Sequence, residues 1–77
     1  MEVKHHDNGM YAPTATVTIS RITPTGLIDL TVAWADKGGM WIITHILDED
    51  GGEAFLTKTE EQLARSLVEA GVDETGR

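Results

Sequence analysis

The sequence predicts an α+β fold, an antiparallel β-meander of three to four strands followed by one C-terminal helix packed on one face. Three observations lead to this prediction. Apolar and polar residues alternate along much of residues 14–47, which is the period of half-buried strands. Turn sequences divide that stretch, and the apolar residues of 57–71 recur at helical spacing. The 77 residues are expected to form a single small domain.

The first two strands are predicted by alternation on either side of a proline-glycine turn. Residues 14–20 alternate threonine or serine with apolar residues. Residues 23–26, Thr-Pro-Thr-Gly, predict a turn because proline fixes φ and glycine admits positive φ. A second strand follows over 27–35, and its even positions form an apolar face that carries Trp34. We call this the Trp face and expect the helix to cover it.

A third strand is expected over residues 40–47, after the glycine turn of 37–39. A two-residue turn makes even positions of one strand pair with odd positions of the next. If Lys37 and Gly38 are central in the turn, His45 lies on the Trp face as a structural residue, either packed or exposed at the sheet edge. The expected cross-strand pairs are then Trp34–Trp41, Val32–Ile43, Leu30–His45 and Ile28–Leu47.

The acidic stretch 48–53, Asp-Glu-Asp-Gly-Gly-Glu, is expected to form a third turn. Its centre is either Asp50-Gly51 or Gly51-Gly52, since both pairs suit a tight hairpin. Residues 54–56 can then add a short fourth strand.

The helix is expected to begin at Thr59 or at Thr57. Each threonine is followed three residues later by Gln or Glu, which is the pattern of a capping box. Gly71 stands where a left-handed residue ends a helix. The residues expected on the apolar side are Leu63, Ala64, Leu67, Val68 and Ala70.

The two ends of the chain have weaker patterns. Residues 1–13 are expected to be either mobile or a small N-terminal ribbon, and residues 72–77 a frayed tail.

The formal net charge of -7 is concentrated in the C-terminal part, because residues 48–77 carry nine acidic and three basic side chains. Such a field repels phosphates, so neither direct nucleic-acid binding nor membrane binding is expected, whereas basic protein surfaces are attracted. The sequence has no cysteine, which excludes disulfides and thiolate chemistry. No apolar run is long enough to span a bilayer, and a cytoplasmic location is expected.

No residue set suggests catalysis, a cofactor or a metal site, so an enzyme is not expected. His5 and His6 are expected in a solvated tail rather than, with Asp7, in a weak nickel or copper site. The acidic stretch lacks the spacing of an EF-hand calcium loop.

Two surfaces are candidates for protein binding. An acidic surface, either functional or only solubilising, would meet a basic partner through Asp48, Glu49, Asp50, Glu53, Glu60 and Glu61. The sheet face opposite the Trp face is unusually apolar and needs a cover: a second copy, a partner, or the N-terminal segment with Met10 and Tyr11. Its expected docking residues are Ala33, Ala35, Met40, Ile42 and Ile46.

Two hypotheses of function follow. The first is a small acidic, non-catalytic protein-interaction module, and in a more specific form a phage or mobile-element inhibitor of a nucleic-acid-handling complex, with carboxylates in place of phosphates, anti-CRISPR-like in type. The alternative is a structural or accessory subunit that self-associates or docks through the apolar sheet face. A protein partner with a basic surface and a homodimer are the expected assemblies.

Overall fold

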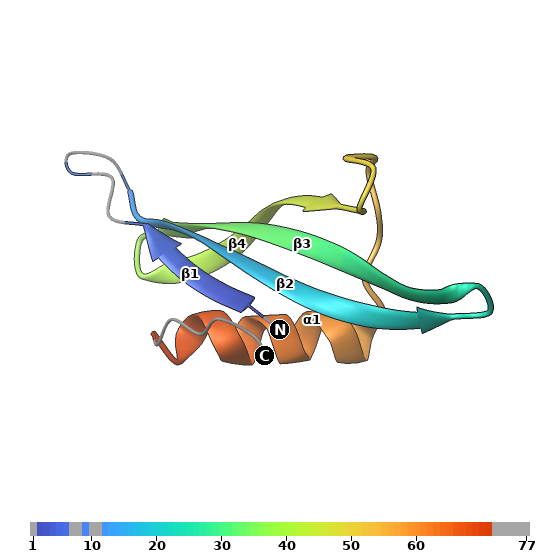
Figure 1. The fold of residues 1–77 in the computed structure, drawn as a ribbon. Coiled ribbons are helices and arrows are strands. Elements are labelled where there is room, and N and C mark those ends of the chain that lie inside the picture. Colours follow the sequence, from blue (N-terminus) through green and yellow to red (C-terminus); the bar gives the residue numbers. More distant parts are fainter. Residues whose placement is uncertain (1, 7–8, 10–11, 72–77) are drawn as a thin grey trace.

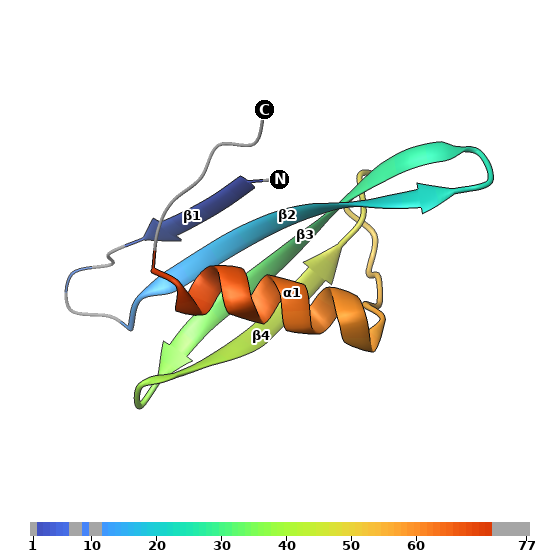
Figure 2. The same ribbon diagram turned by 90° about the horizontal axis from the view of Figure 1, so that it is seen from below.

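A computed structural model describes residues 2–6, 9 and 12–71 of the chain. It contains one four-stranded antiparallel sheet in the order β1-β2-β3-β4, with a single helix packed across one face (Figures 1 and 2). The elements are β1 (Glu2–His6), β2 (Thr14–Thr23), β3 (Gly26–Lys37), β4 (Met40–Leu47) and α1 (Lys58–Glu69). The predicted α+β fold, a meander followed by a C-terminal helix on one face, is confirmed.

β1 completes the four-stranded sheet. It pairs antiparallel with β2, from Glu2↔Thr18 to His6↔Thr14. The prediction of a strand at 54–56 is wrong. Beyond β4 the ladder continues only through an isolated bridge at Glu53 and through the Ala54 N–H, which donates to the Ile46 carbonyl at 2.9 Å. The chain then turns toward α1, because the side chains of Ala54 and Leu56 pack against the core.

The expectations for Asp7, Met10, Tyr11 and 72–77 concern residues outside those described.

The β3–β4 hairpin turns at Gly38 and Gly39, since Lys37 pairs with Met40. Both glycines have positive φ, 65° and 86°. A two-residue turn with positive φ at both central positions matches the right-handed twist of its strands, and glycine adopts it without strain. The turn centre predicted at Lys37 and Gly38 is therefore wrong by one residue, and the partner of Trp34 is wrong by two, since Trp34 pairs with Ile43 rather than Trp41.

A β-bulge in β4 changes the register a second time. Trp34 pairs with Ile43, but Ala33 pairs with His45, so Thr44 is an extra residue on β4. The Thr44 hydroxyl donates to the Ala33 carbonyl at 3.2 Å.

The bulge inverts the faces of the residues that follow it. Ile46 lies opposite Val32 and packs against the core, whereas His45 lies opposite Ala33 and is exposed. The predictions that His45 is on the Trp face and Ile46 on the opposite face are both wrong, because an inserted residue shifts a strand's side chains to the other face.

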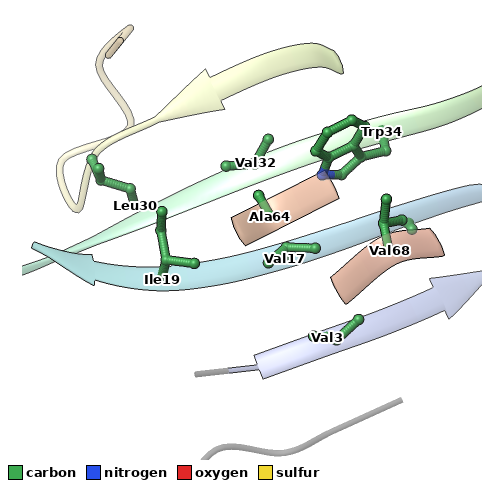
Figure 3. Packing of buried hydrophobic residues seen from close by; sticks show 9 residues of the cluster. Val3, Val17, Ile19, Leu30, Val32, Trp34, Ala64 and Val68 are labelled. Atoms are coloured by element: carbon green, nitrogen blue, oxygen red, sulfur yellow. The ribbon is translucent and has the colours of Figure 1, made fainter. Parts of the chain in front are cut away.

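The core lies between the sheet and α1, and it includes the Trp face (Figure 3). Trp34 is its largest fully buried side chain. The buried residues are Val3, Ala15, Val17, Ile19, Leu30, Val32, Trp34, Ala64 and Val68. Burial of these apolar side chains on one face drives the helix onto the sheet.

Helix α1 begins after Thr57, which is the N-cap. Its hydroxyl accepts from the Glu60 N–H at 3.2 Å, and the Glu60 carboxylate accepts from the Thr57 N–H at 2.8 Å. This reciprocal capping box decides between the two predicted starts. Gly71, with φ of 71°, follows the C-cap. No helix in the described ranges is long and apolar enough to cross a membrane.

Candidate docking face

The sheet face that points away from α1, here called the open face, has no helix or strand of the described residues over its centre (Figure 1). Strand register assigns side chains to it, because cross-strand partners share a face. Three rows cross the four strands: Glu2–Thr18–Thr31–Leu47, Lys4–Thr16–Ala33–His45, and His6–Thr14–Ala35–Ile42. Beyond them lie the pairs Lys37–Met40 at one end and Ser20–Asp29 and Ile22–Leu27 at the other.

The centre of the open face is uncharged and built from small residues, threonine on β2 and mainly alanine on β3. Apolar side chains gather toward β4, where Met40 is 66% exposed. Ile22 and Leu27, at the far end, are 84% and 67% exposed. The structure thus places the predicted Ala33, Ala35, Met40 and Ile42 together on one surface.

Charged residues stand at the margins of the open face. On β1, Lys4 Nζ lies 3.5 Å from Glu2 Oε1. Lys37 is exposed at one end of β3, and within the described residues no ion pair involves it. Asp29 occupies the other end of the same strand, where its Oδ1 accepts from the Ser20 hydroxyl at 2.9 Å.

The stretch 48–53, here called the acidic loop, is a tight turn organised by Asp48. The Asp48 carboxylate accepts from the N–H groups of Asp50 and Gly52 at 2.9 and 2.8 Å. The Gly51 N–H donates to the Asp48 carbonyl at 3.1 Å, so Glu49 and Asp50 are the central residues and Gly51, with φ of 80°, follows them. Both turn centres predicted from the sequence, Asp50-Gly51 and Gly51-Gly52, therefore lie too far toward the C-terminus, by one and two residues.

Glu49 ties the acidic loop to the sheet. Its Oε1 accepts from the Asp29 N–H at 2.7 Å, which satisfies a backbone donor of β3 beyond the end of β4. The connection from β4 to α1 rises on the side of the sheet away from the helix (Figure 1). The acidic loop therefore forms a rim at the Asp29 end of the open face.

Glu60 has a structural role. Arg21 Nε donates to Glu60 Oε2 at 2.9 Å, and Arg21 Nη2 donates to Glu60 Oε1 and, at 2.7 Å, to the Phe55 carbonyl. The Arg21 hydrogen bonds are the main cause that lowers the pKa of Glu60 to about 2. The same bonds raise the pKa of Arg21.

Three of the six predicted acidic residues are thus occupied inside the fold: Asp48, Glu49 and Glu60. Asp50, Glu53 and Glu61 are exposed and form no ion pair with any residue that the structure describes. Within the described part of the chain there is no cluster of three or more potential metal ligands.

The outer edge of β4 is closed to strand addition at two points. Arg65 Nη1 donates to the Trp41 carbonyl at 2.9 Å, and the Ala54 N–H takes the Ile46 carbonyl. The Arg65 guanidinium also lies 5.1 Å from the centroid of the Trp34 ring. An edge strand with its acceptors satisfied is a poor template for another chain.

His5 does not lie in a solvated tail, as the sequence suggested. Its Nε2 is 2.9 Å from the Val68 carbonyl, and its ring meets the Trp41 ring edge-on at 5.8 Å between centroids. His6, one residue along the strand, is exposed on the other face. Because successive side chains of a strand alternate between its faces, His5 and His6 lie on opposite faces of β1 and cannot bind one metal ion together.

Comparison with protein-family models, with curated proteins and with solved structures finds no match to this chain. The predicted docking residues did not include Leu47, Ile22 or Leu27, which also lie on the open face. Ile22 and Leu27 flank the Thr-Pro-Thr-Gly turn, and exposed apolar residues beside a turn were the available signal.

Proposed function

We propose that this chain is a non-catalytic protein-interaction module whose docking surface is the open face. The observation that supports this most is the apolar, uncharged character of a sheet face that α1 leaves uncovered. The second face of an antiparallel sheet is commonly polar when it faces water. Here it carries Ala33, Ala35, Met40 and Ile42 in adjacent positions.

The acidic loop gives this module a charge preference. Asp50, Glu53 and Glu61 are free to meet a basic partner, because the structure's internal contacts use the other acidic residues. A narrower form of the proposal is an inhibitor, of phage or mobile-element origin, that occupies the basic channel of a nucleic-acid-handling complex in the cytoplasm. The net charge of -7 supports this form, since carboxylates then stand where phosphates bind.

A structural or accessory subunit is the second candidate. The threonine- and alanine-rich centre favours it, because small uncharged side chains allow two flat surfaces to approach closely and remain in contact. The two candidates differ in salt dependence. Binding through carboxylates weakens as salt rises, whereas burial of apolar surface does not.

The experiment is affinity capture from cell lysate at low and high salt, with three variants. Ile42→Asp places a charge on the open face, and Leu63→Asp makes the same apolar-to-acid change on exposed α1 as a matched control. The triple change of Asp50, Glu53 and Glu61 to Lys tests the acidic residues. We expect Ile42→Asp to lose proteins that wild type and Leu63→Asp retain.

Identical captured proteins for wild type and Ile42→Asp, with an unchanged mass in solution, would contradict docking through the open face. If the triple lysine variant captures the same proteins at every salt concentration, the inhibitor form is wrong and the subunit form remains.

A further inference from the structure

We propose that the occupant of the open face is a second copy of this chain, packed face to face about a two-fold axis that crosses the strands at Ala33. This inference rests on the proposed function, since it names the partner of the same surface. It is carried by charge complementarity along β3 and by the area of the face.

The two charged residues that β3 places on the open face, Asp29 and Lys37, are symmetric about Ala33 and opposite in sign. A two-fold axis in the plane of the interface and across the strands reverses strand direction in the second copy. The residue four positions before Ala33 then lies over the residue four positions after it, which places Asp29 over Lys37 of the second copy. Symmetry creates this pair twice. Packed sheets are about 10 Å apart, within the combined reach of Lys and Asp side chains.

The same axis pairs the outer rows of the open face. On β4, Ile42 lies over Leu47 of the second copy, because their rows are equally far from the Ala33 row. On β1, Glu2 lies over His6 of the second copy by the same rule. The row on the axis faces itself, so Lys4, at the margin of the face and 3.5 Å from Glu2, lies over Lys4 of the second copy. Thr31 lies over Ala35.

The other in-plane axis, along the strands, gives a poorer match. It places β1 over β4 of the second copy, so that Glu2 faces Leu47 and a charge is buried against an apolar side chain. It also leaves Asp29 over Ser20 of the second copy and Lys37 without an acidic residue. The distribution of charge therefore selects the axis across the strands.

The acidic loop reinforces this choice. It forms a rim at the Asp29 end of the open face, tied there by Glu49. In the two-fold arrangement that rim stands beside the Lys37 end of the second copy. The negative end of each copy thus meets the positive end of the other.

The area is sufficient for a specific but weak dimer. Four strands at about 4.8 Å spacing and eight residues at about 3.3 Å each cover roughly 500 Å² per copy, or about 1,000 Å² in total. Specific interfaces begin at about 1,000 Å². We therefore expect association in the micromolar range. Association through the edge of β4 is disfavoured, since Arg65 and Ala54 already occupy two of its carbonyls.

Charge-swap variants test the arrangement by sedimentation velocity over a series of protein concentrations. Lys37→Glu and Asp29→Lys each place two like-charge pairs in their own dimer, so each is expected to weaken self-association about 10-fold or more. Mixing the two variants restores both opposite-charge pairs, and a one-to-one heterodimer is expected. Lys58→Glu makes the same charge change on exposed α1 and should leave the dimer intact. Circular dichroism verifies that each variant is folded.

A wild-type chain that stays monomeric at all concentrations, or a mixture that associates no better than its components, would overturn the two-fold arrangement. Ala33→Arg, which places bulk and charge on the axis, provides a second test if Asp29→Lys fails to fold, and a dimer that survives it also overturns the proposal. If the wild-type chain is a monomer but captures a protein that Ile42→Asp does not, only the proposal of a second copy is refuted. An Ile42→Asp variant unchanged in both mass and captured proteins refutes the docking function as well.

Discussion

Arg21 and Glu60 join the sheet to the helix through two hydrogen bonds between a guanidinium and a carboxylate, the Nε–Oε2 bond measuring 2.9 Å. The two residues are 39 positions apart in the chain. The same carboxylate closes the capping box of α1 by accepting from the Thr57 N–H. Glu60 thus fixes both where the helix starts and where it lies on the sheet.

Replacing Glu60 should therefore destabilise the fold more than replacing its neighbour. Glu60→Gln keeps the size of the side chain but removes the charge that pairs with Arg21, and we expect the Tm to fall by about 5 °C. Glu61→Gln is the matched control and should change the Tm little, since Glu61 is exposed. Thermal unfolding followed by circular dichroism measures both. Equal effects of the two changes would mean that the Arg21 pair contributes nothing.

The lowered pKa of Glu60 predicts how stability depends on pH. The folded-state pKa is about 2 against an ordinary value of 4.5, so the carboxylate stabilises the fold above the unfolded-state value. That contribution is lost as pH falls from about 4.5 toward about 2. Urea unfolding at a series of pH values should show this loss in wild type. In Glu60→Gln the slope over the same window should be smaller, and an unchanged slope would assign the acid sensitivity to other carboxylates.

The N-cap predicts a contrast between two threonines that the sequence presents as equals. Thr57→Ala removes the side-chain acceptor for the Glu60 N–H and should cost about 1 kcal/mol in the free energy of unfolding. Thr59→Ala lies in the exposed first turn and should change it by less than about 0.5 kcal/mol. Chemical denaturation of both variants checks this, and a larger loss in Thr59→Ala would place the cap at the wrong residue.

Arg65 predicts a link between the helix and aggregation. Arg65→Met retains apolar packing beside Trp34 but removes the donor to the Trp41 carbonyl, which reopens the edge of β4. We expect faster aggregation on mild heating, measured by light scattering. Glu69→Gln, which removes the carboxylate 3.9 Å from Arg65, should aggregate at the wild-type rate. If Arg65→Met stays as soluble as wild type, the edge needs no protection.

The fold class follows from the sequence because alternation, turn residues and helical spacing are local signals. Trp34 illustrates this: its face is visible from the even positions of one strand. The bulge at Thr44 has no such signal, since the run Ile-Ile-Thr-His-Ile holds neither glycine nor proline. One inserted residue therefore reversed the expected faces of His45 and Ile46. The pairing of Arg21 with Glu60 was also hidden, because it depends on how the helix crosses the sheet.

The acidic surface shows the same limit. Composition reveals an excess of carboxylates but not which of them the fold consumes. Asp48 bonds to its own loop and Glu49 to the backbone of β3, and both facts depend on geometry. Because these contacts use several of the carboxylates, the proposed function rests more on the open face than on the acidic residues.

The central structural claim is that the open face binds a second copy of this chain, and the accessibility of that face in solution tests the claim most directly. A soluble nitroxide broadens the NMR signals of methyl groups that it can reach. In concentrated protein we predict that the methyl groups of Thr31, Ala33 and Ile42 are protected, while Leu63 on α1 stays accessible, and that dilution removes the protection. Open-face methyl signals that broaden equally in dilute and in concentrated protein would contradict association of this chain through that face.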